Sequence, residues 1–314
     1  MTHRGAGPAP PASSRAPVSR TRAWLMASRP ATLPAAAVPV LVGGAAAVST
    51  GATPRPVVLL ATLVSALCIQ VGTNFANDYS DFHRGADHAG RLGPTRVTQS
   101  GLLASSSVRH GIIVAFGAAA LVGAGLAVTG GWPIIAIGLA SILCGLAYTG
   151  GPWPFGYHGL GDLFVFVFFG LVAVTGTAYL QSGSWSALAL AAAVPIGLLV
   201  TNILVINNLR DLPTDREAGK RTLATRIGDG ATRAQYALFT ILAYLVPAAL
   251  SLTSPARRWL LLPLVSAPLA AGLVRTVLGG VAGRALNPML GRTGKLLLVF
   301  GLLFAAGLVL ARRG

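Results

Sequence analysis

The 314-residue chain has few charged side chains, and acidic ones are the scarcest. Charged residues make up 10% of the sequence and only 8 are Asp or Glu, whereas a soluble domain has roughly a quarter of its residues charged. Hydrophobic residues account for 54%, and the mean hydropathy is +0.69. These values exclude an ordinary soluble domain and predict a polytopic membrane protein whose surroundings are the lipid bilayer.

Cysteine is also rare, and no segment of the sequence resembles a signal peptide. The two cysteines, Cys68 and Cys144, lie in apolar runs, where they are expected to be small buried hydrophobes rather than a disulfide. Cys and His do not occur at zinc-binding spacing. The first twenty residues contain no apolar stretch. We therefore expect residues 1–20 to form a disordered basic cytoplasmic tail and residues 21–314 to form one transmembrane domain.

The net charge of +16 raises the possibility of a nucleic-acid partner. The basic residues, however, lie in the connections between apolar segments, and no basic stripe with interleaved aromatic residues is present. The sequence therefore predicts no nucleic-acid binding, and it gives no indication of the oligomeric state.

Nine apolar segments approach the roughly 20 residues that a helix needs to cross a bilayer. The first contains Pro30, Pro34 and Pro39, so it is expected to be kinked or to begin late. The expected segments are 23–49, 57–77, 108–129, 132–148, 162–181, 186–208, 233–253, 258–279 and 295–312. We therefore predict an all-α membrane protein with nine transmembrane helices around a cytoplasm-facing catalytic cavity.

The distribution of basic residues predicts the orientation. Most of the 24 Lys and Arg residues lie in the N-terminal tail and in the connections after the second, sixth and eighth segments. The exceptions are Arg55, Arg257, Arg258, Arg312 and Arg313. Because cytoplasmic loops carry the excess of positive charge, the N-terminus is expected inside and the C-terminus outside.

The few carboxylates are clustered at the ends of apolar segments. One cluster follows the second segment and contains Asp78, Asp81 and Asp87; the other follows the sixth and contains Asp211, Asp215, Glu217 and Asp229. Four crossings separate the clusters, so both are expected on the cytoplasmic side, where they can meet. Only Asp162 stands apart.

Within each cluster the polar residues follow helical spacing. Asn74, Asp78 and Asp81 are spaced i, i+4, i+7, and Asn207, Asp211 and Asp215 are spaced i, i+4, i+8, so each set lies along one helix face. Two opposing oxygen-rich faces suit Mg²⁺, which takes one or two carboxylates together with substrate phosphate. Flanking basic residues, above all Arg91 and Lys220, are candidates to bind the same phosphates, although membrane topology alone explains most basic residues. The alternative interpretation is that these Asn and Asp side chains only cap helices or form turns.

These residues resemble the two Asp-rich motifs of the intramembrane UbiA-type prenyltransferases. Within that family, the chain is most similar to the 1,4-dihydroxy-2-naphthoate polyprenyltransferases of menaquinone synthesis (the MenA type). Four stretches carry the resemblance in the same order along the chain: residues 74–87, 91–101, 148–162 and 207–223. The resemblance makes residues 21–314 a UbiA-like transmembrane prenyltransferase domain.

The resemblance implies transfer of a polyprenyl chain from polyprenyl diphosphate to 1,4-dihydroxy-2-naphthoate with decarboxylation, giving demethylmenaquinone. Mg²⁺ would be the cofactor. The metal ligands implied are Asp78, Asp81, Asp87, Asp211 and Asp215, of which all but Asp87 are also catalytic candidates. The substrate-binding candidates are Asn74, Asn77, Arg91, Asn207, Asn208 and Lys220. Prenyl chain length is not readable from the sequence.

Two further residues are catalytic candidates, and at two other positions the chain differs from the family pattern. Tyr148 is a catalytic candidate, because an aromatic ring face stabilises an allylic cation; interfacial packing is its alternative role. Asp162 is expected first as a helix N-cap and second as a catalytic group facing the aromatic acceptor. Gly85 stands where the broader family often has a further Asp, and Pro152 stands where many relatives have a basic residue.

Two alternatives remain at the level of sequence. The acceptor could be another aromatic acid, such as 4-hydroxybenzoate or homogentisate. In a different class, the protein could be a membrane transporter, but transporters carry ionisable residues within their spans. Here the charged residues lie at the ends of the segments, which favours interfacial catalysis.

Overall fold

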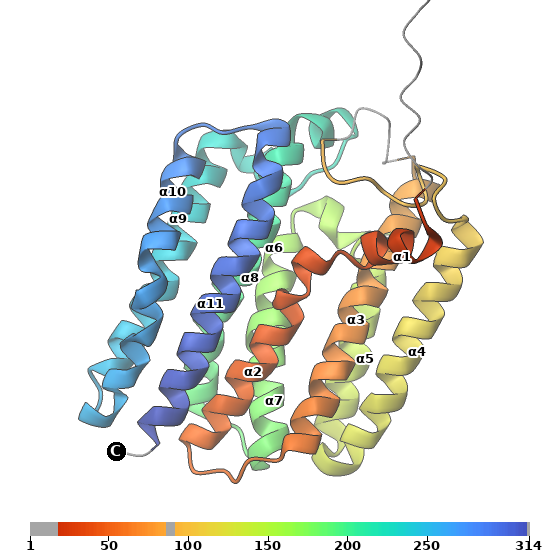
Figure 1. Ribbon diagram of the computed structural model, residues 1–314. Coiled ribbons are helices and arrows are strands. Elements are labelled where there is room, and N and C mark those ends of the chain that lie inside the picture. The colour runs from red at the N-terminus through yellow and green to blue at the C-terminus, as the bar shows by residue number, and fades with distance from the viewer. Residues whose placement is uncertain (1–17, 86–91, 313–314) are drawn as a thin grey trace, which may run out of the picture.

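The computed structural model describes residues 18–85 and 92–312, and within them it contains helices and connecting loops but no β-strand. The predicted all-α membrane fold is therefore confirmed (Figure 1). The helices form one bundle, with the C-terminal end of α11 at the end of the bundle opposite α1.

In the described part of the chain, seven helical stretches are long and apolar enough to cross a membrane. Three are single helices: α3 (Pro56–His83), α4 (Ser105–Gly130) and α8 (Ala187–Glu217). A fourth, α9 (Leu223–Ser251), is interrupted by a kink at Gly228, whose φ of 83° is not helical. Three combine shorter elements. One joins α6 (Gly161–Val165), a π-helical segment (Phe166–Val172) and α7 (Ala173–Ser182); the next joins a 3-10 segment (Pro255–Ser266) and α10 (Ala267–Leu278); the last joins a 3-10 turn (Gly283–Leu286) and α11 (Asn287–Ala311).

The remaining two predicted segments explain why the structure gives seven or eight spans rather than nine. The first is a pair of helices, α1 (Arg20–Ser28) and α2 (Pro34–Ser49), joined by a 3-10 turn (Pro30–Thr32) and bent by 50°. The other, α5 (Trp132–Ala147), has only 16 residues. The prediction of nine helices is thus close in number, but the segment 23–49 is not one continuous helix and 132–148 is a short one.

Proline causes the break in the first segment. Pro30 disfavours right-handed helical geometry at the residue before it, so α1 ends there, and Arg29 takes the left-handed conformation of a helix C-cap, with φ of 51°. The Arg29 N–H bonds the Met26 carbonyl at 3.2 Å and ends α1. A second proline, Pro34, then begins α2 in a new direction.

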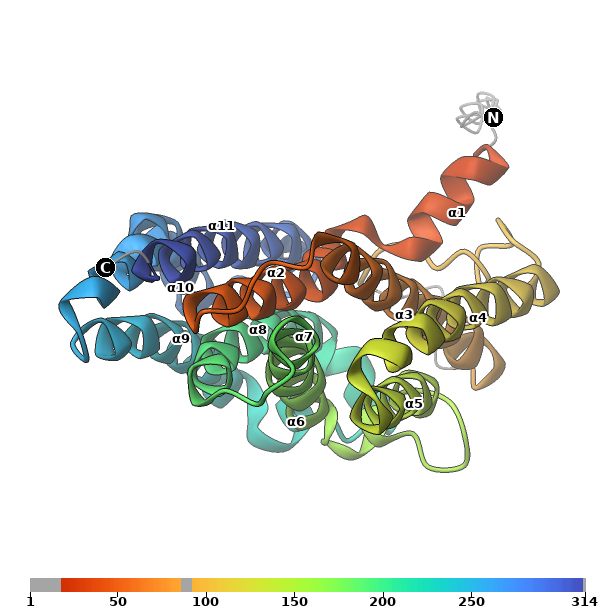
Figure 2. The same cartoon turned by 90° about the horizontal axis from the view of Figure 1, so that it is seen from below.

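The arrangement of the helices places the two acidic clusters at one end of the bundle. Helix α8 is the most buried helix, and α2 packs between α11 on one side and α7 on the other (Figure 2). Helix α3 packs along α4. The ends of α3 and α8 that carry the acidic residues lie at the same end of the bundle as α1 (Figure 1).

Close packing of α2 on α7 gives a stability prediction. A Cβ at Gly43 would overlap the Val174 carbonyl oxygen and lie 2.8 Å from Thr177 Cβ. Gly43→Ala is therefore expected to destabilise the bundle by about 1–3 kcal/mol through overpacking. Gly117→Ala on α4 is the matched control, because no atom lies within 4 Å of its added Cβ. Thermal unfolding of both purified variants in detergent checks this; equal melting temperatures would contradict the packing argument.

Candidate functional site at one end of the bundle

The first acidic motif, defined here as Asn74, Asn77, Asp78 and Asp81, occupies the last turns of α3, and all four side chains are buried. Helical spacing places them on one face, as the sequence predicts. Asp78 accepts hydrogen bonds from two backbone N–H groups, those of Val97 at 3.2 Å and Thr98 at 3.1 Å. Asp78 therefore also anchors the loop that follows the motif.

The two asparagines of this motif bond the polypeptide itself. Asn74 Nδ2 donates to the Ser28 carbonyl at 3.0 Å and to Thr32 Oγ1 at 3.1 Å, which ties α3 to the break in the first span. Asn77 Oδ1 accepts from Thr149 Oγ1 at 2.8 Å. Their predicted contact with substrate remains a prediction, and these bonds give both residues a structural role as well.

Asp81 is held from two sides. Arg96 Nη2 donates to its Oδ2 at 2.6 Å, and both side chains are almost completely buried. The Tyr157 hydroxyl donates to Oδ1. Each oxygen of a carboxylate has two acceptor positions, so Asp81 keeps lone pairs for a further partner while its orientation is fixed.

The second acidic motif, defined here as Asn207, Asn208, Asp211 and Asp215, lies on the last turns of α8. It is organised by Arg210, whose side chain has no solvent exposure. Arg210 donates to Asp211 Oδ1 at 2.8 Å from Nε and to Oδ2 at 2.5 Å from Nη2. Arg210 Nη2 also donates to Asn207 Oδ1 at 2.7 Å. Asp211 is therefore the counter-ion of a buried guanidinium.

Asp215 is buried and forms an ion pair with Lys220. Its partner Lys220 has its Nζ atom 3.8 Å from Asp215 Oδ1, which is longer than a hydrogen bond. The same Nζ lies 4.5 Å from the centre of the Tyr157 ring. Lys220, a predicted phosphate ligand, thus stands between the second motif and a residue that bonds the first.

Two bridges join the motifs, as the prediction that they can meet requires. In one, Tyr157 contacts Asp81 and Lys220. In the other, Arg210 Nη1 donates to Asn287 Oδ1 at 3.1 Å, and Asn287 Nδ2 donates to the Leu92 carbonyl at 3.0 Å. Gly93 lies so close to Arg210 that an added Cβ would be 2.7 Å from Nη2. The loop after the first motif therefore rests on the second.

Tyr148 follows α5 at the same end of the bundle. Its ring meets Phe155 edge to face with 5.5 Å between centroids. Its carbonyl accepts a hydrogen bond from the Gly156 N–H at 3.0 Å, in the turn that also carries Tyr157. The role of Tyr148 beside the reacting chain remains a prediction.

The expected capping role of Asp162 is wrong. The N-cap of α6 is Leu160, and Asp162 lies in the first helical turn without a capping bond. Its Oδ2 accepts from Gln235 Nε2 at 2.7 Å, while Oδ1 is buried and has no hydrogen-bond partner among residues 18–85 and 92–312. The N-cap interpretation fails because the chain enters the helix two residues earlier than the charge pattern indicates.

Two predicted residues, Asp87 and Arg91, lie outside the described residues. Sequence reasoning missed four others that organise the site: Tyr157, Arg210, Gln235 and Asn287. Each is distant in sequence from a partner it contacts or lies in a loop, so no spacing rule identified it. The position of Arg210 directly before Asp211 was the one available signal.

The donor set fits magnesium better than a metal held by protein alone. In the part of the chain that the structure describes, no three His, Cys, Asp or Glu side chains gather closely enough to hold an ion. Mg²⁺ is commonly bound by one or two carboxylates, with water and substrate phosphate completing its shell. Asp81 and Asp215 provide two carboxylates of this kind, and each also has a basic side chain beside it.

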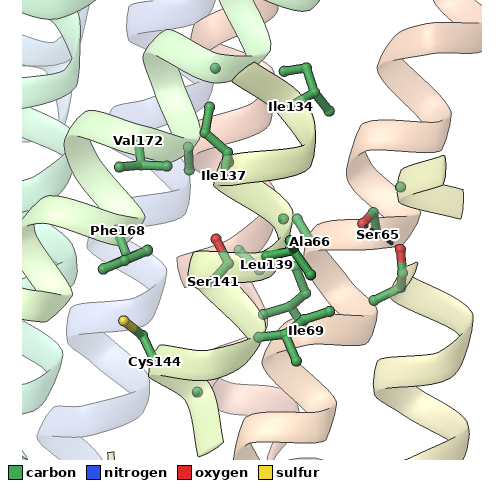
Figure 3. A pocket seen from close by; sticks show the side chains of 18 of the residues that line it. Ser65, Ala66, Ile69, Ile134, Ile137, Leu139, Ser141, Cys144, Phe168 and Val172 are labelled. Atoms are coloured by element: carbon green, nitrogen blue, oxygen red, sulfur yellow. Dashed lines mark hydrogen bonds between the residues drawn. The ribbon is translucent and has the colours of Figure 1, made fainter. Parts of the chain in front are cut away.

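An apolar cavity of about 550 Å³ begins beside Tyr148 and Phe155 and runs along the bundle. Figure 3 shows lining side chains from α3, α5 and the π-helical segment, among them Ser65, Ile69 and Phe168. Residues from α2, α4, α6 and α7 also line the cavity. The apolar lining of the cavity suits a hydrocarbon chain. The end of the cavity near Tyr148 lies close to the acidic motifs.

Comparison with known proteins gives consistent matches. The model of the UbiA prenyltransferase family matches residues 36–285. The 1,4-dihydroxy-2-naphthoate octaprenyltransferase of Mycobacterium tuberculosis is 42% identical over 91% of this chain and 96% of its own. The enzyme of the same name from Escherichia coli is 37% identical over 94% and 97%.

A solved structure supports the fold. A UbiA homolog from Archaeoglobus fulgidus, bound to DMAPP and Mg²⁺, superposes with a TM-score of 0.60 and covers 90% of this chain and 99% of its own. The identity is 15%, so this likeness concerns the fold alone. The matches support an enzyme and give no support to the transporter alternative.

Proposed function

Since this chain belongs to the UbiA prenyltransferase family, we propose that it transfers a polyprenyl chain from its diphosphate to 1,4-dihydroxy-2-naphthoate. A carbon–carbon bond forms between the first prenyl carbon and the aromatic ring, and diphosphate and carbon dioxide leave. The immediate product is the prenylated dihydroxynaphthalene, demethylmenaquinol, whose separate two-electron oxidation gives demethylmenaquinone; this places the enzyme in menaquinone biosynthesis. The structural observation that carries the proposal is the placement of two linked acidic motifs beside the mouth of an apolar cavity.

The cofactor proposed is Mg²⁺. Asp81 and Asp215 are the proposed principal ligands, and Asp78 and Asp211 support them through the loop and through Arg210. When bound, the ion would neutralise charge that develops on the leaving diphosphate. Related UbiA homologs have been crystallised with prenyl diphosphates and Mg²⁺, which supports divalent-metal use in this fold.

The remaining steps use residues of the chain itself. The cavity holds the prenyl tail and excludes water from the allylic carbon, because its wall is almost entirely apolar. Lys220 is placed to bind a diphosphate oxygen. Tyr148, at the junction of cavity and motifs, offers a ring face to positive charge on the prenyl chain. Loss of the acceptor carboxylate removes the need for a strong general base.

The protein is a multi-pass membrane protein, and we propose that its site faces the cytoplasm. The orientation follows from the positive-inside rule applied to the sequence. Arg84 follows the first motif at the end of α3, and Arg96 and Lys220 pair with Asp81 and Asp215. Arg55 precedes α3, and Arg312 bonds the loop before it, at the other end of that helix. A diphosphate made in the cytoplasm would then reach the motifs without crossing the bilayer.

Membranes containing the protein should convert 1,4-dihydroxy-2-naphthoate and an octaprenyl donor to the prenylated, decarboxylated product in the presence of Mg²⁺. Mass spectrometry of the extracted lipids measures this. Parallel reactions contain 4-hydroxybenzoate or homogentisate, and a further set contains EDTA. Product from either of these acids but not from the naphthoate would transfer the assignment to another acceptor, and full activity in EDTA would exclude the metal.

A further inference from the structure

Tyr157 links the two acidic motifs, although it belongs to neither, because it contacts Asp81 and Lys220. It lies in a 3-10 turn, Phe155–His158, in the loop between α5 and α6. Its hydroxyl bonds Asp81 of the first motif. Its ring lies under Lys220, the partner of Asp215 in the second motif.

The loop does not need this side chain for its own structure. Its backbone is fixed by other bonds, from the Gly156 N–H to the Tyr148 carbonyl at 3.0 Å and from the Tyr157 N–H to the Pro154 carbonyl at 2.9 Å. The Tyr157 carbonyl accepts from the Arg221 N–H at 2.9 Å, and the His158 carbonyl accepts from Arg226 at 2.8 Å. The phenol is therefore available for a function other than holding the turn.

The hydroxyl determines how Asp81 presents its oxygens. Arg96 bonds one oxygen and Tyr157 the other, so rotation of the carboxylate is blocked from both sides. A carboxylate has about four acceptor positions, and the two bonds leave the others open. Groups that orient a metal ligand in this way typically change metal affinity by about 10- to 100-fold when removed.

The ring has a separate effect on Lys220. A tyrosine face attracts an ammonium group, and here it holds Nζ 3.8 Å from Asp215, outside hydrogen-bonding distance. A hydrogen-bonded ion pair would occupy the lysine protons. The ring thus keeps the Lys220 ammonium group available for a phosphate oxygen.

We propose that Tyr157 is a positioning residue with two separable roles: its hydroxyl orients Asp81 for Mg²⁺, and its ring holds Lys220 for the diphosphate. This rests on the proposed function in that it assumes a metal and a diphosphate at the site. It does not depend on the identity of the aromatic acceptor.

Two substitutions separate the roles. Tyr157→Phe removes the hydroxyl and keeps the ring, and Tyr157→Leu removes both. Binding of Mn²⁺ to purified protein, measured by electron paramagnetic resonance, should weaken about tenfold in both variants. The affinity for inorganic pyrophosphate at saturating Mn²⁺ should remain near wild type in Tyr157→Phe and fall severalfold in Tyr157→Leu.

Tyr179→Phe is the matched control, because the Tyr179 hydroxyl bonds the Gly130 carbonyl at the opposite end of the bundle at 3.1 Å. It should leave both affinities unchanged. Wild-type Mn²⁺ affinity in Tyr157→Phe would overturn the role of the hydroxyl, and equal pyrophosphate affinities in the two variants would overturn that of the ring. Both measurements omit the acceptor. A protein that prenylates a different ring therefore fails the activity assay above while these binding shifts persist.

Discussion

Asp215→Asn should lower the rate of prenyl transfer by about 10²- to 10³-fold, or roughly 3–4 kcal/mol of transition-state stabilisation. The amide keeps the shape of the carboxylate but removes the negative charge that a metal ion beside the leaving diphosphate requires. The substitution keeps the size of the side chain, and thermal unfolding of the variant is measured beside the rate because Asp215 is buried and forms an ion pair with Lys220 at 3.8 Å. The rate is measured at several Mg²⁺ concentrations with the octaprenyl donor.

Glu217→Gln is the control for this substitution. It makes the same change from carboxylate to amide two residues further along α8, where the side chain is exposed. Its rate should equal that of the wild type. Full activity of Asp215→Asn at ordinary Mg²⁺ concentration would remove Asp215 from the site.

The structure shows why the four motif carboxylates are unequal as experimental probes. Asp211 neutralises Arg210, which is completely buried. Breaking such a pair by removing one partner typically costs about 3–5 kcal/mol of stability. Loss of activity in Asp211→Asn would therefore combine an effect on catalysis with an effect on folding, and Asp81→Asn would do the same through Arg96.

The helical faces of the site are predictable from sequence because they depend on local periodicity. Asn74, Asp78 and Asp81 share a face of any helix that contains them, and the apolar segment before them predicts that helix. Placement of the two motifs at one end of the bundle follows equally from counting the crossings between them. Both expectations rest on short-range geometry, which the sequence contains.

The bridges between the motifs were not predictable. Tyr157 lies 76 residues from Asp81, in a turn whose conformation no periodic pattern indicates. Arg210 contacts Asp211 although adjacent helical residues do not normally face one another; the long guanidinium side chain bends back because Asn207 and Asn287 hold its other donors. Such contacts depend on tertiary packing, which one sequence does not reveal.

The number of spans shows a similar limit. Hydropathy identifies apolar stretches, but it does not show how each one is built. Helix α5, with 16 residues, is about 24 Å long at 1.5 Å per residue, which is shorter than the roughly 30 Å hydrocarbon core. The break at Arg29 depends on the placement of Pro30 and Pro34, and the sequence predicts a kink there but not its angle.

Gly138→Phe should strongly lower the rate of transfer from long donors while sparing short ones. Gly138 lines the cavity and has no atom within 4 Å of an added Cβ, so a phenyl ring would occupy the cavity rather than displace the backbone. It lies ten residues before Tyr148, or about 15 Å along the axis of α5. Transfer from octaprenyl diphosphate should fall about 10- to 100-fold, corresponding to roughly 1–3 kcal/mol of overpacking. Dimethylallyl diphosphate, whose chain ends well before this point, should react at a nearly unchanged rate.

Gly125→Phe tests whether this selectivity arises in the cavity. Gly125 also has open space around an added Cβ, but it is exposed on α4 and is not among the cavity-lining residues. A phenyl ring there should face lipid and change neither reaction. Retention of octaprenyl transfer by Gly138→Phe would place the prenyl tail elsewhere. Loss of both donors would instead indicate damage at the acidic motifs. If Gly138→Phe alone selectively loses the long donor, the prenyl tail must run from Tyr148 past Gly138. Only in that position would the effect of a substitution at Gly138 depend on the length of the prenyl donor.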